Sequence, residues 1–142
     1  MNIKNIAILI VITAIFAAIA FTLIKKEPQI EKAIVTDSLN FSENDLRKGS
    51  ADINTFNTDS DVYLILLVKD LKKESNFKIR WIRTESGADE IIQEDSIHTK
   101  KEGSGTLSLS LSKKDNRYQP GFYTVNITFE DKEPVIKEFN VK

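Results

Sequence analysis

Few side chains in this sequence are of the types that perform catalysis, and none is spaced as a catalytic group would be. His98 is the only histidine, and the chain holds no cysteine and no second histidine to complete a metal site with it. Ser104, Ser108, Ser110 and Ser112 lie in a run of small and apolar residues and lack the G-x-S-x-G context of an activated nucleophile. We therefore expect a solvated histidine, outward-facing serines and no enzyme activity.

One loop could bind a cation. Residues 57–61 read Asn-Thr-Asp-Ser-Asp, so Asp59 and Asp61 place two carboxylates two residues apart, and oxygen ligands of this kind suit Ca²⁺. The glycine and the distant glutamate of an EF-hand loop are missing. Asx turns that lead into the next strand explain the same residues. We favour a turn and expect no cofactor, with calcium left as the alternative.

A charged pair marks a candidate binding face. In residues 77–83, FKIRWIR, the apolar residues alternate with Lys78 and Arg80, which predicts a strand with these two side chains and Ile82 on its outward face. This face could contact an acidic protein or an anionic polymer of the cell envelope. A solvated strand surface is the alternative. All 21 acidic residues follow residue 26, so residues 27–142 have a negative net charge. This charge argues against a nucleic-acid partner.

The elements that position these residues begin with an apolar segment. Residues 6–24 carry no charge and would span about 28 Å as a helix, which is the thickness of a bilayer core. We predict a transmembrane anchor in residues 1–26, in contact with membrane lipid, with the rest of the chain outside the cytoplasm (N-in, C-out). The lysines at 25 and 26 favour the opposite orientation by a strict positive-inside count. Ala18-Ile19-Ala20 leaves a cleaved signal peptide as the alternative.

Short strands account for most of the remaining chain. Residues 27–32 are interpreted as a juxtamembrane linker, and residues 33–142 as one domain without helices. Residues 38–61 are polar and predict a loop with a short strand near Ile53. About seven short strands separated by turn residues predict an all-β antiparallel sandwich. The expected strands are residues 33–36, 62–68, 77–83, 106–112, 122–129 and 135–141, with short pieces at 90–93 and 97–99.

Two motifs resemble the immunoglobulin fold. Trp81 lies in the middle of a predicted strand, and Gly121-Phe-Tyr123-Thr-Val125 is similar to the G-x-Y-x-C run of that superfamily, with valine in place of cysteine. Leu66 or Val68 would replace the other cysteine of the family. The order of these motifs is similar to that of bacterial and archaeal membrane-anchored Ig-like ectodomains of unassigned function.

The resemblance implies positions for the core. Trp81, Tyr123 and Val125 would point inward, with Leu107 and Leu109 facing Trp81 across the sandwich. The Tyr123 hydroxyl would donate to a backbone carbonyl upstream, as a tyrosine corner does. These motifs specify a fold and no activity.

We expect a non-catalytic module that binds a protein or an envelope component. A small structural subunit of a larger membrane complex is a second hypothesis, because Ala14, Ala17, Ala18 and Ala20 would permit close helix packing. A secreted sandwich follows if the N-terminal segment is cleaved.

Overall fold

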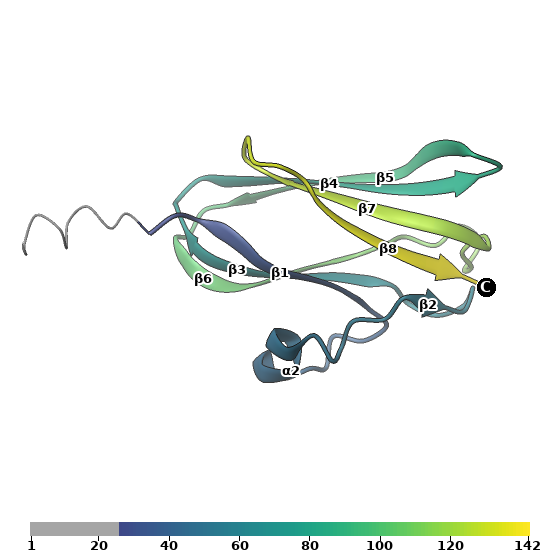
Figure 1. The fold of residues 1–142 in the computed structure, drawn as a ribbon, viewed down its shortest axis with the longest axis horizontal. Coiled ribbons are helices and arrows are strands. Elements are labelled where there is room, and N and C mark those ends of the chain that lie inside the picture. Colours follow the sequence, from purple (N-terminus) through teal and green to yellow (C-terminus); the bar gives the residue numbers. More distant parts are fainter. Residues whose placement is uncertain (1–25) are drawn as a thin grey trace, which may run out of the picture.

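Two β-sheets and one short helix make up the structure, a computed structural model that describes residues 26–142 (Figure 1). The smaller sheet has the order β1-β3-β6 and the larger one the order β2-β8-β7-β4-β5. Neighbouring strands are antiparallel except β2 and β8, which are parallel. The smaller sheet contains β1 (Gln29–Thr36), β3 (Tyr63–Leu71) and β6 (Gly103–Ser110). The larger contains β2 (Thr55–Phe56), β4 (Ser75–Glu85), β5 (Ala88–Thr99), β7 (Gly121–Phe129) and β8 (Val135–Val141).

The sheets pack face to face around an aromatic centre. Trp81 is 0% exposed and lies edge-on to Phe139, with ring centroids 6.5 Å apart. Tyr123 stacks on the same Phe139 ring at 5.2 Å. Val125 is also fully buried, so the inward positions predicted for the third strand and the late strand are confirmed. Leu107 and Leu109 are only half-buried, because they come from β6 at the edge of the smaller sheet.

A second, smaller core lies on the outer side of the β1-β3-β6 sheet. The helix α2 (Glu43–Lys48) covers this side below the sheet in Figure 1 and buries Leu46 against Ile65 and Leu67 of β3. This cover explains why β3 is apolar on both faces. The expectation that residues 33–142 contain no helix is wrong, since α2 is present. Ser42 is the N-cap of this helix and accepts a hydrogen bond from the Asp45 backbone N–H at 3.2 Å.

Several strands differ from the predicted ranges, and β1, β5 and β6 differ in ways that change the interpretation. β1 begins at Gln29, which pairs with Lys69, so residues 29–32 of the predicted linker belong to the smaller sheet. β5 is one strand of 12 residues where two short pieces were expected. Its sequence is polar, and the strand forms because residues 88–99 pair with β4 along its whole length. β6 covers residues 103–110 rather than 106–112.

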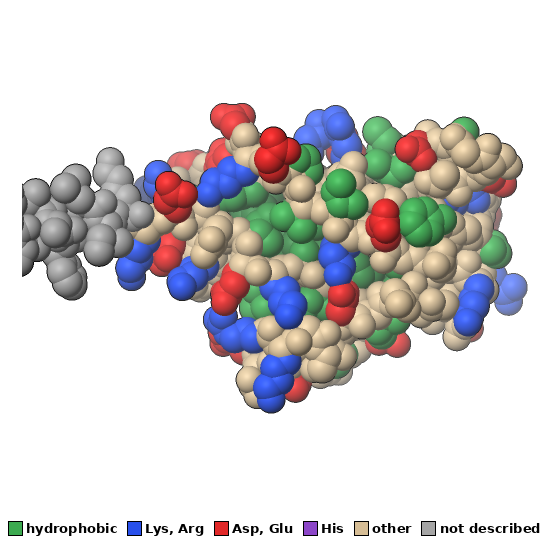
Figure 2. Space-filling view, viewed as in Figure 1, with side chains coloured by type: hydrophobic (Ala, Val, Ile, Leu, Met, Phe, Trp, Pro, Cys, Tyr) green, Lys and Arg blue, Asp and Glu red, His purple; other side chains and the backbone are tan. Residues whose placement is uncertain are grey.

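The predicted anchor (residues 1–26), apart from its last residue, and the predicted cleavage site lie outside the described residues. From residue 26 onward, no helix of the structure has the length and apolar character to cross a bilayer. β1 starts at one end of the sandwich and the C-terminus lies at the other (Figure 1). Figure 2 shows the side of β1 and β8, where apolar side chains are visible between the sheets and charged side chains surround them.

Candidate functional site

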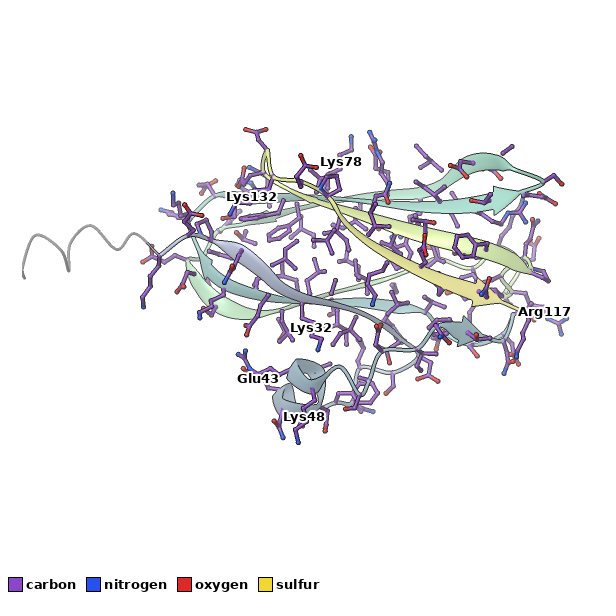
Figure 3. The ribbon with its side chains drawn as sticks, in the orientation of Figure 1. Lys32, Glu43, Lys48, Lys78, Arg117 and Lys132 are labelled. Atoms are coloured by element: carbon purple, nitrogen blue, oxygen red, sulfur yellow. The ribbon has the colours of Figure 1, made fainter. Side chains whose placement is uncertain are left out.

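The outer face of the larger sheet contains the three residues predicted to bind. Lys78 and Arg80 are exposed and Ile82 is half-buried, while the residues between them point into the core. Figure 3 shows Lys78 on the side of this sheet that faces away from the smaller sheet. The predicted strand face is therefore present, with all three side chains in one row along β4.

A carboxylate from the neighbouring strand pairs with both cations of this face. Glu94 of β5 lies opposite Arg80 in the register and accepts a hydrogen bond from Arg80 Nε at 2.7 Å. Lys78 Nζ lies 3.3 Å from the other Glu94 oxygen. The hydrogen bond from Arg80, and then that from Lys78, hold the pKa of the Glu94 carboxyl below its usual value. The sequence did not indicate this partner, because it placed the end of the strand at residue 93.

Four apolar residues lie on the same face, with Thr124 and Asn126 between some of them: Ile82, Ile91, Phe122 and Ile136, which we call the apolar band. Ile82 lies opposite Ile91 of β5 and Thr124 of β7 in the register. Phe122, two residues before Thr124, is 38% exposed, and Ile136 of β8 is 57% exposed; Ile91 is 55% exposed. These residues all occupy outward positions of their strands. Their side chains place large apolar surface beside the paired charges.

Polar side chains close the side of the sandwich where β5 runs past β6. The Trp81 indole N–H donates to the Asp95 carboxylate at 3.0 Å, and the Gln93 amide donates to the same carboxylate at 2.8 Å. The Gln93 amide also donates to the Ser110 carbonyl at 3.0 Å, and its oxygen accepts from the Ser112 backbone N–H at 2.8 Å. The indole N–H is thus satisfied although the ring is buried.

A hollow of about 280 Å³ at the end that carries the C-terminus is built around the predicted tyrosine corner. The Tyr123 hydroxyl donates to the Gln119 carbonyl at 2.6 Å, as expected, and burial raises the pKa of this tyrosine. Arg83 is only 8% exposed and donates to the Gln119 side chain and to Glu85. Because Arg83 already has these partners, we interpret it as a support of the corner.

The other sequence candidates have local roles. His98 lies against Asn76, 2.7 Å from its side-chain oxygen, and against Glu74. In the loop at 57–61, Lys113 Nζ donates to the Asp59 carbonyl at 2.6 Å and pairs with Asp61 Oδ1 at 2.8 Å. An ammonium group therefore contacts the Asp61 carboxylate, one of the two that were considered for calcium. Within residues 26–142, no group of three or more His, Asp or Glu side chains could hold a metal ion.

Comparison with known proteins gives no relative: no protein-family model matches the chain, and no match was found among curated proteins. The site is therefore interpreted from its own chemistry.

Proposed function

We propose that this chain is a single-pass membrane protein that carries an extracytoplasmic Ig-like sandwich and binds another protein through the outer face of the larger sheet. Trp81 on β4 and Tyr123 on β7 lie on adjacent strands of one sheet, opposite the sheet that holds β1, β3 and β6. This arrangement supports an Ig-like assignment, in which the core tryptophan and the corner tyrosine belong to neighbouring strands.

The apolar band of Ile82, Ile91, Phe122 and Ile136 carries the proposal. Apolar residues within a polar and charged rim are typical of the centre of a protein–protein interface. Three of these side chains are among the large hydrophobic residues that the structure leaves exposed. The Lys78–Glu94–Arg80 cluster beside the band would form part of the rim, where charges set orientation and association rate more than affinity.

With the predicted anchor, the outer face of the larger sheet would stand roughly perpendicular to the membrane surface. Only residues 25–28 separate the apolar segment from β1, a link of at most about 14 Å. The end of the sandwich where β1 starts would then lie near the lipid surface. The strands would run away from the bilayer, so the outer face of the larger sheet would stay accessible to a neighbouring membrane or envelope protein.

Site-specific photocrosslinking of the full chain in its native membrane tests the proposal. A photoreactive residue at Ile136 should give a protein adduct, and the same residue at Lys48 should not. Lys48 is a suitable control because it is exposed at the end of α2, on the side of the smaller sheet. Adding Ile91→Asp should reduce the adduct at position 136. Equal adducts at both positions, or an adduct insensitive to the Ile91 substitution, would contradict binding by this face.

A further inference from the structure

The free edge of β6 is unprotected, unlike the other sheet edges of the described residues. The edge of β1 is bonded at Val35, whose N–H donates to the Asp52 side chain at 2.9 Å and whose carbonyl accepts from the Ile53 N–H at 2.8 Å, and the strand carries the charges of Glu31 and Lys32. β2 is only two residues long. β5 has a β-bulge opposite Trp81 and Ile82 and carries the acidic residues Asp89, Glu90, Glu94 and Asp95. Charges and bulges of this kind discourage pairing with another strand, and β6 has no charged residue from Gly103 to Ser110.

The hydrogen bonds at the end of β6 show which backbone groups point to this edge. The Leu111 N–H points toward β3, because it donates to the carbonyl of Val62, the residue before β3, at 2.9 Å. The Ser110 carbonyl points the other way and accepts from the Gln93 side chain. Gln93 also accepts from the Ser112 N–H. The Gln93 amide therefore contacts the two groups that a neighbouring strand would use, and it ends the free edge at Ser110.

The same alternation leaves Thr106 and Ser108 available. Thr106 lies opposite Leu67 and Ser108 opposite Ile65, in the same phase as Ser110. In an antiparallel pair, residues in this phase direct both the N–H and the C=O away from the partner strand. The backbone groups of Thr106 and Ser108 thus point toward the free edge.

A hollow lies on each side of this edge. The hollow on the outer side has a volume of about 250 Å³ and is lined by Leu39, Phe41, Leu46, Ile65, Thr106 and Ser108, and also by Glu43, whose carboxylate pairs with Arg47. The hollow on the inner side has a volume of about 340 Å³, and its apolar lining comes from Val68, Leu71 and Leu107. Side chains of an added strand alternate between the two faces of the sheet, so successive side chains would enter one hollow and then the other.

We propose that β6 accepts an extended, uncharged segment of a partner protein as an additional strand. Backbone hydrogen bonds to Thr106 and Ser108 would hold the segment, and apolar side chains in the two hollows would select it. A second copy of β6 fits less well, because it would offer serine and threonine to the outer hollow. It would also bring two acidic β5 strands together, where like charges repel. This surface is separate from the apolar band of the larger sheet.

Amide hydrogen exchange of the full chain in detergent micelles, with a synthetic peptide as the probe, tests this inference. The probe is acetyl-Lys-Thr-Val-Ile-Val-Thr-Lys-amide, whose centre is an uncharged strand, and the control peptide has proline in place of the isoleucine. We expect the probe at saturation to slow exchange of the Thr106 and Ser108 amides at least tenfold and to leave β5 unchanged. The proline peptide should have no effect.

Two substitutions of Ser108 test whether the peptide binds at the free edge of β6. Ser108→Pro removes an edge N–H, and Ser108→Lys places a charge at the outer hollow; each should weaken peptide binding at least tenfold. Ser96→Lys, the same change at an exposed serine of β5, should leave binding unchanged. Unchanged exchange of β7 amides checks that each variant is folded. Protection located on β5, or binding that is insensitive to both Ser108 variants, would overturn the proposal. Dimers that form without peptide and dissociate in Ser108→Lys would overturn it in favour of a second copy.

Discussion

Trp81 provides the sharpest test of the core, because its ring is fully buried and its indole N–H bonds to a carboxylate. Trp81→Ala should lower the free energy of unfolding by about 3–5 kcal/mol, as the loss of a large buried aromatic residue does. Trp81→Phe keeps most of the apolar volume but removes the donor. A hydrogen bond to a charged group contributes about 1.5–3 kcal/mol, and we expect the lower end because Asp95 is only half-buried.

A double-mutant cycle isolates this hydrogen bond. Trp81→Phe, Asp95→Ala and the double variant should show a coupling energy of about 1–2 kcal/mol, within the range measured for residues in contact. Urea unfolding followed by far-UV circular dichroism gives the values, since Trp81→Phe and the double variant lack the single tryptophan of the chain. The unsubstituted protein should show blue-shifted Trp81 emission that moves to longer wavelength on unfolding. Additive effects within about 0.5 kcal/mol, or emission of a water-exposed indole in the native protein, would refute the assigned contacts.

Further predictions concern the tyrosines and the charged cluster. Tyr123→Phe should lower the free energy of unfolding by about 1 kcal/mol in urea titrations, because the hydroxyl bonds to a backbone carbonyl. Lys78→Ala and Arg80→Ala should each change it by less than about 0.5 kcal/mol, since their pairs with Glu94 are exposed to solvent. Burial raises the pKa of Tyr118 from 10.0 to about 12 and also raises that of Tyr123. Neutral tyrosine is therefore favoured in the folded state, so stability should be unaffected by these groups below about pH 10 and should fall between pH 10 and 12. Absorbance of tyrosinate during a pH titration should show both groups ionising later than free tyrosine.

Strict alternation made the central strands predictable. In residues 77–83 and 122–129 the apolar residues repeat every second position, and this pattern alone sets which side chains are buried. β5 lacks the pattern because only Ile97 of its inward positions is apolar and packs against the core. Gln93 and Trp81 instead both donate hydrogen bonds to Asp95. The full length of such a strand cannot be predicted from residue alternation, because its polar side chains gain their hydrogen-bond partners only in the folded protein.

The helix α2 and the Arg80–Glu94 pair were not predicted from the sequence, for two different reasons. Ser42 followed by Asp45 is a capping signature that the sequence does contain, but α2 has only six residues and too few apolar positions for a helical period. Glu94 could not be assigned to Arg80 because the pairing of β4 with β5 depends on a register shift between Trp81 and Ile82. Local residue patterns do not specify such a shift.

Stability and the proposed binding can be tested separately, because separate carboxylates form the hydrogen bonds on the two open sides of the sandwich. On the side of β1 and β8, Asp52 accepts hydrogen bonds from the Val35 N–H at 2.9 Å and from Lys137. On the side of β5 and β6, Asp95 accepts from Trp81 and Gln93. These groups close the open sides of the sandwich through internal bonds, which leaves the apolar band and the β6 edge as surfaces that no internal contact requires. Substitution of Asp52 or Asp95 should therefore reduce stability, whereas Ile136 and Ser108 can be changed to test binding while the core stays intact.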